Sequence, residues 1–226
     1  MYNHKIDAIE ILPVKPANAS VIWLHGLGAS GDDFIPITKE LHLPNHLNIR
    51  FIFPHAPIKP ITINNGARMR GWYDIKDFKA LDINQEDSHE GLIDSKIIID
   101  NLINREISLG INSEKIVLAG FSQGGALALH AGLRFKSKLA GIICLSGYLP
   151  WHHLLMQEKA KINTSTSIFM AHGELDQIVP MNFSKNSYNF LQQLGYNILW
   201  HSYLMQHTVV EQEIIDIDNF LNQVLA

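Results

Sequence analysis

Short apolar segments alternate with longer segments of helical periodicity along this sequence, and this alternation constrains the fold more than any other feature. Six apolar segments read as buried strands: residues 21–24, 49–53, 115–121, 140–145, 167–171 and 197–203. Strands that are apolar on both faces and alternate with helices form a mostly parallel sheet covered on both sides. The fold class expected is therefore α/β, with helices on both faces of a central sheet.

Two of the intervening segments show the spacing of one helical face. The residues that fit one helical face are Leu92, Lys96, Ile99, Leu102 or Ile103 and Ile107 in the first segment, and Val210, Ile214, Ile217, Leu221 and Val224 in the second. Four of the strands end near glycine. In parallel sheets functional groups gather in the loops beyond the carboxyl ends of the strands, so these loops are where we expect a site.

The chain has 226 residues, which at about 150 residues per domain allows one large domain or two small ones. No internal repeat, low-complexity tract or Gly/Ser-rich linker divides it. The elements from residue 21 to residue 224 form one succession of strands and helices, so we expect a single domain over residues 1–226.

Composition excludes several classes of protein. The 18 basic and 22 acidic residues give a net charge of −4, which argues against a nucleic-acid partner. One cysteine cannot form an internal disulfide. No apolar run approaches the roughly 18 residues of a membrane span, so we expect no transmembrane segment. Lys5, Asp7 and Glu10 interrupt the N-terminal apolar residues, unlike a signal peptide, and we expect a cytoplasmic protein.

The segment Gly120-Phe121-Ser122-Gln123-Gly124 matches the pattern G-x-S-x-G between a predicted strand and a predicted helix. A sharp strand-to-helix turn exposes the serine in a strained conformation and needs small neighbours. The following helix directs free N–H groups and its positive dipole end towards the same place. Ser122 is therefore the predicted nucleophile, and the alternative is a serine N-cap beside a glycine turn.

A serine hydroxyl needs a base to remove its proton, and in this arrangement the acid and then the histidine follow the serine in the chain. Asp176 and His207 each lie in a polar loop just after a predicted strand, at the same sheet edge as Ser122. Glu174 is a rival acid. The other histidines fit less well, because they lie in a strand or precede the acid, as His172 does.

Acyl transfer also needs donors for an oxyanion. One is the backbone N–H of Gln123, after the nucleophile, and the second comes from the loop after an earlier strand. The segment His25-Gly26-Leu27-Gly28 provides such a loop, with Leu27 N–H as the predicted donor, unless this segment is a plain tight turn. No metal-binding set and no phosphate-binding loop of the form G-x-x-x-x-G-K-[ST] is present, so we expect no cofactor and no metal.

Residues 54–86 form the one long segment without a periodic pattern, and long loops of this kind are often functional. The pair Trp72-Tyr73 within it lines a binding surface or packs onto the edge of the core, and the residues alone leave both alternatives open. Cys144 lies in an apolar strand and is expected to be a small core residue.

The segments HGLGASGDDF, FPHAP, RGWYDI, GFSQGG, HGELDQIVP and MQHTV, in this order, resemble the bacterial carboxylesterase and acyl-protein thioesterase family of small α/β-hydrolases. The resemblance implies an α/β-hydrolase fold, Ser122, Asp176 and His207 as a catalytic triad, and Leu27 and Gln123 as oxyanion donors. It also implies that the segment around Trp72 borders the acyl site and that weak homodimers form. Relatives commonly carry a glycine before the catalytic histidine and a serine after it, whereas this chain has Met205-Gln206-His207-Thr208.

The expected function is therefore hydrolysis of carboxylic esters, with thioesters as a further class, through an acyl-enzyme. Alternatives are a lysophospholipase, an acyl-protein thioesterase, or a non-catalytic binding protein on the same scaffold. The chain also leaves little room for a lid after the sixth strand. Residues 148–166, with Trp151, Leu154, Leu155 and Met156 clustered on them, form a wall or a brief flap. We expect a shallow site without a large lid, between this segment and residues 54–86.

Overall fold

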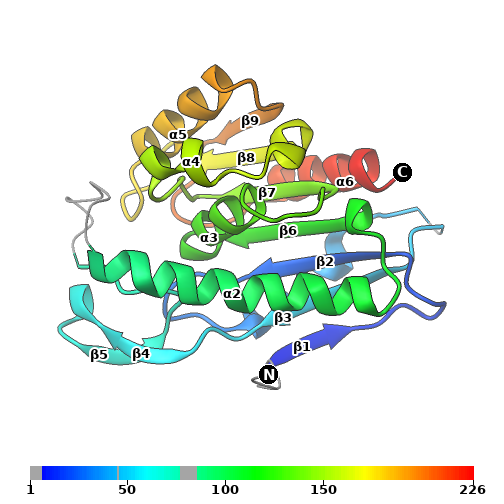
Figure 1. The fold of residues 1–226 in the computed structure, drawn as a ribbon, viewed down its shortest axis with the longest axis horizontal. Helices are drawn as coiled ribbons and strands as arrows, with labels where there is room; N and C mark the ends of the chain where they lie inside the picture. Colours follow the sequence, from blue (N-terminus) through cyan, green and yellow to red (C-terminus); the bar gives the residue numbers. More distant parts are fainter. Residues whose placement is uncertain (1–6, 45, 77–85) are drawn as a thin grey trace.

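A seven-stranded sheet forms the centre of the computed structural model, which describes residues 7–44, 46–76 and 86–226 (Figure 1). The strands lie in the order β1-β3-β2-β6-β7-β8-β9. Only β1 runs antiparallel to its neighbour, and the other neighbouring pairs are parallel. Their bounds are Ala8–Ile11 (β1), Ala19–Leu24 (β2), Ile49–Pro54 (β3), Ile116–Phe121 (β6), Gly141–Leu145 (β7), Ser167–Gly173 (β8) and Ile198–Tyr203 (β9). The six predicted strands are confirmed to within two residues at either end, and β1 was not predicted.

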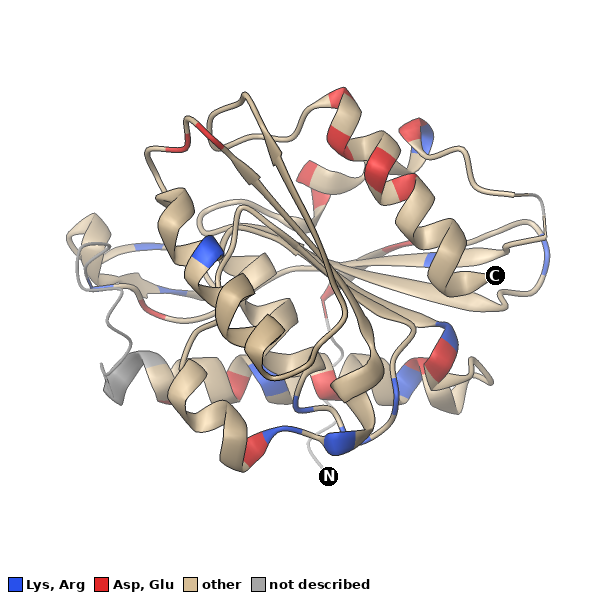
Figure 2. Ribbon diagram, turned by 90° about the horizontal axis from the view of Figure 1, so that it is seen from above, with Lys and Arg blue, Asp and Glu red and all other residues tan. Residues whose placement is uncertain are grey.

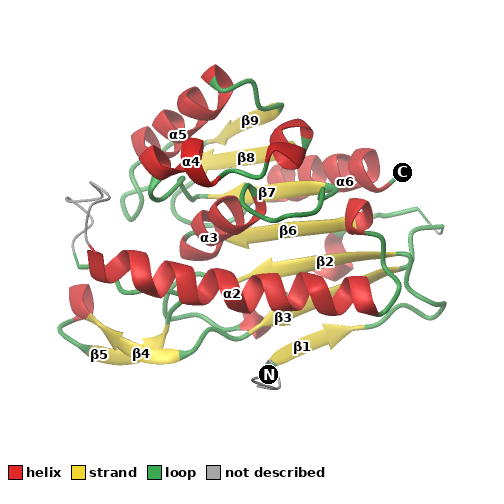
Figure 3. Cartoon of the chain, viewed as in Figure 1, coloured by secondary structure: helices red, strands yellow, loops and turns green. Residues whose placement is uncertain are grey.

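Helices cover both faces of this sheet, as predicted (Figure 3). One face packs against α2 (Glu86–Ser108), α3 (Gln123–Gly132) and α5 (Met181–Gln193), and the other against α1 (Ile37–Glu40) and α6 (Glu211–Leu225). The short α4 (Leu155–Glu158) lies on the side of α2 and α3.

Strands β2, β6, β7 and β8 carry no Asp, Glu, Lys or Arg, and neither does α3 (Figure 2). Their sequences therefore suit burial from both sides. All six residues of β2 and all ten of α3 are buried. The charged residues lie on the outer helices, in the loops and on the other strands, such as Glu10 on β1 and Arg50 on β3. Burial of apolar area at roughly 25 cal/mol per Å² is the main stabilising contribution to such a layered core.

Residues 54–86 were expected to be irregular, and this prediction is wrong for part of the segment. A two-stranded antiparallel hairpin forms there from β4 (Ile58–Ile61) and β5 (Ala67–Arg70). Asn65 and Gly66 turn between these strands with φ of 54° and 74°, the left-handed conformation that an Asn-Gly pair adopts readily. The strands are only four residues long, mix apolar residues with Lys59, Arg68 and Arg70, and include a proline, so they show no regular apolar pattern. Residues 77–85 of the expected loop lie outside the described residues.

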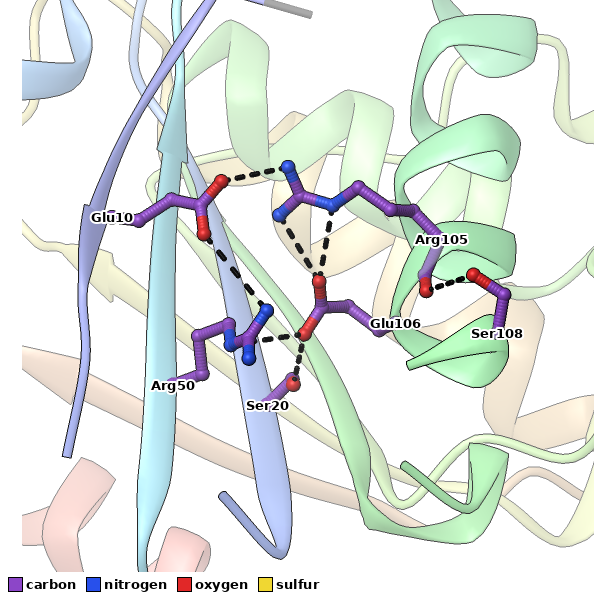
Figure 4. Close-up of polar contacts among 6 residues, drawn as sticks. All are labelled: Glu10, Ser20, Arg50, Arg105, Glu106 and Ser108. Carbon is purple, nitrogen blue, oxygen red and sulfur yellow. Dashed lines mark hydrogen bonds and ion pairs between the residues drawn. The ribbon is translucent and has the colours of Figure 1, made fainter. Parts of the chain in front are cut away.

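The buried face of α2 differs from the predicted one by one position near its end. Glu106 is wholly buried there, whereas Ile107 is only partly buried. Ser20 Oγ donates to Glu106 Oε2 at 2.6 Å, and Arg105 Nη2 lies 3.0 Å from Oε1 (Figure 4). Arg50 Nε lies 3.7 Å from Glu106 Oε2. Glu10 contacts both arginines, so this network joins α2 to β1, β2 and β3.

Replacing Glu106 with alanine is expected to destabilise the fold by about 1–3 kcal/mol, because the buried Ser20 hydroxyl loses its acceptor and two arginines keep only Glu10 as a carboxylate partner. Urea unfolding measures this change. The matched control is Lys138→Ala, which removes a surface ion pair with Glu114 at 3.6 Å and is expected to cost less than about 1 kcal/mol. Equal losses in the two variants would contradict a special role for the buried network.

A second buried carboxyl, Glu213 in the first turn of α6, makes stability depend on pH. Burial raises its pKa to about 8, with Asp216 adding to the rise and the Val210 backbone opposing it. An unfolded glutamate titrates near pKa ~4.3, so the folded state binds this proton more tightly. The protonated Glu213 carboxyl therefore makes its full contribution to the free energy of unfolding at pH values below the unfolded pKa. This contribution is lost as the pH rises through about 8.

Glu213→Gln removes this titration, so the free energy of unfolding of the variant relative to the wild type is expected to rise from pH 5 to pH 8.5. Denaturant unfolding at both pH values tests this. Glu211→Gln, at an exposed position in the same turn, is the control and should show no such rise. A flat difference for Glu213→Gln would show that the carboxyl is charged throughout.

Candidate active site

Ser122 lies at the turn between β6 and α3, with φ of 55° and ψ of −121°. Few non-glycine residues adopt such a conformation, and it is strained unless its surroundings hold it. A Cβ on Gly124 would lie 2.2 Å from Leu24 O, and one on Gly120 would lie 2.3 Å from Gly124 C. The glycines predicted to surround the serine therefore permit the close backbone contact that fixes the turn.

The structure brings Asp176 and His207 together in the loops after β8 and β9. The distance between Asp176 Oδ2 and His207 Nδ1 is 2.7 Å. The His207 ring packs on the Phe121 ring at 4.7 Å between centroids, which places it beside the turn that carries Ser122. All three predicted residues thus lie at one edge of the sheet, beyond the carboxyl ends of parallel strands.

Asp176 is held as a buried carboxylate. Burial alone raises its pKa, but hydrogen bonds from His172, His207 and Val179 outweigh this and hold the pKa well below its usual range. Its Oδ1 accepts the backbone N–H groups of Ile178 and Val179, each at 2.9 Å. Because its side chain is 0% exposed, the negative charge can act on His207 with little screening by water.

The rival residues have other partners. Glu174 is exposed and accepts a hydrogen bond from Ser202 Oγ. His172 is wholly buried, and its Nε2 donates to Val179 O at 2.8 Å while lying 3.4 Å from Asp176 Oδ2. His172 was set aside as a base because it precedes the acid, and its contact with Asp176 was not predicted. The HGELD segment, with the two residues four apart, was the available signal.

The loop with Leu27 is held against the nucleophile turn. A Cβ on Gly26 would lie 3.4 Å from Ser122 Cβ, so Leu27 follows a residue in contact with the serine. His25 is neutral in a fixed tautomer: Nε2 accepts the Ala56 N–H at 3.0 Å, and Nδ1 donates to Gly26 O at 2.7 Å. Burial accordingly lowers its pKa. Gln123 begins α3, and the first N–H groups of a helix have no acceptor within it.

Trp72 and Tyr73 pack onto the core, which is the second of the two alternatives left open by the sequence. Both side chains are buried, Trp72 wholly, and both belong to the main hydrophobic cluster. The Trp72 side chain is therefore not an exposed wall of a binding surface. Its indole N–H donates to His25 O at 2.9 Å, so the polar atom of this buried ring has a partner in the interior.

The segment 148–166 packs on the body of the protein as short helical turns. Trp151 and Leu155 are buried, and Leu154 packs against the same cluster, whereas Met156 is about half exposed. Cys144 is buried as predicted, and burial raises the pKa of its thiol, which disfavours the reactive thiolate. Among the described residues, no helix is long and apolar enough to cross a membrane.

The sequence matches the model of the phospholipase/carboxylesterase family over residues 6–225. The chain belongs to this family. The family assignment makes it a hydrolase of carboxylic ester bonds with the α/β-hydrolase fold, as the sequence predicted.

Several relatives in this family are similar over nearly their whole length. The chain is 38% identical to acyl-protein thioesterase 1 of Yarrowia lipolytica over 217 residues, covering 94% of this chain and 95% of the relative. It is 41% identical to acyl-protein thioesterase 1 of Gibberella zeae, covering 92% and 91%. The crystal structure of Arabidopsis thaliana SOBER1 is similar with a TM-score of 0.85 and 31% identity, covering 93% of this chain and 100% of that structure.

Asp176→Asn is expected to lower kcat by about 10⁴-fold, because an amide cannot hold His207 in the tautomer that accepts the serine proton. Glu174→Gln, two residues away, is the matched control and should keep kcat near the wild-type value. Steady-state hydrolysis of p-nitrophenyl acetate measures both. Loss of activity in Glu174→Gln with retention in Asp176→Asn would reverse the assignment of the acid.

Proposed function

We propose that the chain hydrolyses acyl esters and thioesters through an acyl-enzyme on Ser122, with His207 as the base and Asp176 as the acid that orients it. The observation that carries the proposal is the 2.7 Å contact between Asp176 and His207 beside the strained turn of Ser122. A buried carboxylate paired with an imidazole at this position has the chemistry needed to activate a serine.

In the first half of the reaction, Ser122 Oγ attacks the carbonyl carbon while His207 takes its proton. The carbonyl oxygen becomes an oxyanion, which accepts hydrogen bonds from the backbone N–H groups of Leu27 and Gln123. The positive end of the α3 dipole also favours this charge. The tetrahedral intermediate then collapses, and His207 gives its proton to the departing alcohol or thiol, which leaves Ser122 acylated.

In the second half, water attacks the acyl carbon and His207 takes its proton. The second tetrahedral intermediate expels Ser122 Oγ, to which His207 returns the proton, and the carboxylic acid leaves. Asp176 stays ionised throughout, because its hydrogen bonds hold its pKa well below the usual range despite burial. It stabilises the imidazolium that forms at His207 in each half of the reaction.

We further propose that the substrates are long-chain acyl thioesters on protein cysteines. The support is the similarity to relatives named acyl-protein thioesterases over more than nine-tenths of both chains. A lysophospholipase is the second candidate, because the family description includes phospholipases. The cytoplasmic location, the weak homodimer, the single domain, the shallow site and the absence of a cofactor stay predictions.

Ser122→Ala is expected to lose covalent labelling by a fluorophosphonate and nearly all hydrolysis, leaving about 10³-fold catalysis over water from the oxyanion donors and binding. Gel fluorescence with a tagged probe and ester hydrolysis measure the two effects. Ser146→Ala, at a buried serine after β7, is the control and should still be labelled. A wild-type protein that takes no label and hydrolyses no ester would support the non-catalytic alternative.

The substrate class is tested with two peptides of one sequence, one carrying an S-palmitoyl cysteine and one an O-palmitoyl serine, beside a lysophosphatidylcholine. The proposal expects the highest kcat/KM with the thioester. A p-nitrophenyl ester series from short to long acyl chains then reports the chain-length optimum. A short-chain optimum, or a preference for the lysolipid, would overturn the protein-thioester assignment while leaving the triad in place.

A further inference from the structure

The side chain of Gln123 is buried and bound at both ends of its amide. Its Oε1 accepts the Trp72 backbone N–H at 2.8 Å, and its Nε2 donates to Tyr73 O at 2.7 Å. Gln123 as a whole is only 3% exposed to solvent. The residue whose backbone N–H is the proposed oxyanion donor therefore also holds the segment that follows β5.

Trp72, whose backbone Gln123 holds, also contacts the loop after β2. Its indole N–H donates to His25 O at 2.9 Å, and its ring packs beside the His25 ring with 5.3 Å between centroids. Lys59 Nζ and Ser95 Oγ both donate to Trp72 O, so the backbone of Trp72 is fixed by α2 and β4 as well. The tryptophan is thus a rigid link between Gln123 and His25.

The neighbours of Trp72 hold Leu27 itself. Gly28 N donates to Arg70 O at 2.8 Å, and a Cβ on Gly71 would lie 2.9 Å from Leu27 Cδ1. Any side chain at position 71 would overlap the Leu27 side chain, so Gly71 is what allows Leu27 to pack there. Residues 70–72 contact the oxyanion loop on both sides of Leu27, and Gln123 holds residues 72 and 73.

We propose that Gln123 is a positioning residue: through the backbone of Trp72 and Tyr73, its side-chain amide sets the place of the Leu27 N–H relative to its own backbone N–H. The inference rests on the proposed function, because it concerns the two oxyanion donors of that reaction. It reassigns Trp72 from a substrate contact to part of this link.

The physical reason is that oxyanion donors act only within a narrow range of distances from the developing charge. The two donors come from different loops, one after β2 and one at the start of α3. Loss of one donor costs about 10²–10³-fold in kcat, and a displacement of 1 Å in a reacting group can cost about 10²-fold. A link that joins the loops fixes their separation before the substrate binds.

Gln123→Met tests this sharply, because the backbone N–H of residue 123 remains while both amide contacts are lost. We expect kcat to fall about 10–100-fold, with KM changed less than about threefold. The affinity for a trifluoromethyl ketone that forms an oxyanion should fall by the same factor as kcat/KM. Trp72→Phe removes the indole donor to His25 O and reduces the size of the buried ring, while the Gln123 contacts to the backbone of residues 72 and 73 remain, and it is expected to act in the same direction to a smaller extent.

A matched control is Asn163→Leu. Asn163 is a wholly buried amide that holds loops at the opposite edge of the sheet, bonding Leu139 N, Phe135 O and Ser137 O. Its removal is expected to lower Tm as much as Gln123→Met does while leaving kcat within about twofold of the wild type. Equal effects of both variants on kcat would show that Gln123 contributes only stability.

Gln123→Glu gives a readout that a structural role alone would not move. Its protonated carboxyl can donate to Tyr73 O and accept from Trp72 N–H, as the amide does, whereas the ionised form opposes the Tyr73 carbonyl. Buried carboxyls titrate at raised pKa values, so the ratio of variant to wild-type kcat is expected to rise as the pH falls from about 9 to about 6. Dividing by the wild type removes the titration of groups common to both proteins.

The proposed function and the positioning role of Gln123 are contradicted by different results. Substantial activity in Ser122→Ala would overturn the proposed function itself. A dead Ser122→Ala together with wild-type kcat in folded Gln123→Met, or a ratio for Gln123→Glu that does not change with pH, would overturn the positioning role alone. If Gln123→Met does not fold, Trp72→Phe and Gln123→Glu decide the question by the same kcat and pH measurements.

Discussion

The contact between the first turn of α3 and the ends of β2 and β6 is the constraint on which the rest of this structure depends. At Gly120 and Gly124 the backbones approach so closely that any side chain would overlap a main-chain atom. This approach forces the left-handed conformation of Ser122 and directs the start of the helix towards the site. It also places the loop after β2 beside the serine, so the nucleophile and both proposed oxyanion donors follow from one local packing arrangement.

The sequence predicted much of this fold because its central strands are short, apolar and free of charge. It did not predict β1 or the β4–β5 hairpin, whose four-residue strands mix apolar and polar residues, are too short to show a period and lie at the edge of the fold. It also placed Ile107 where Glu106 is buried. Periodicity identifies apolar faces and cannot identify a carboxylate that becomes buried because Arg50, Arg105 and Ser20 meet it from other elements.

At the site, too, the sequence pattern identified where residues lie along the strands but not which contacts they make with other elements. Strand ends and chain order were sufficient to nominate Ser122, Asp176 and His207. They were not sufficient to choose between Asp176 and Glu174, since that choice depends on how the loop folds: the Ile178 and Val179 N–H groups turn Asp176 inward, and Glu174 faces Ser202. The aromatic residue nominated as a substrate contact, Trp72, is interior because its indole bonds a main-chain oxygen, a contact without a sequence signature.

The loops after β8 and β9 are joined to each other more closely than to the rest of the site. Glu174 N and Leu175 N donate to Tyr203 O and Met205 O, and Gly173 leaves no space between the two loops. Asp176 and His207 therefore lie on two loops that are hydrogen-bonded to each other, whereas the hairpin and residues 148–166 belong to other parts of the chain. Changes in the hairpin or in the 148–166 segment can thus alter the shape of the surroundings while the Asp176–His207 pair keeps its geometry, so that the proposed catalytic apparatus could serve different acyl groups unchanged.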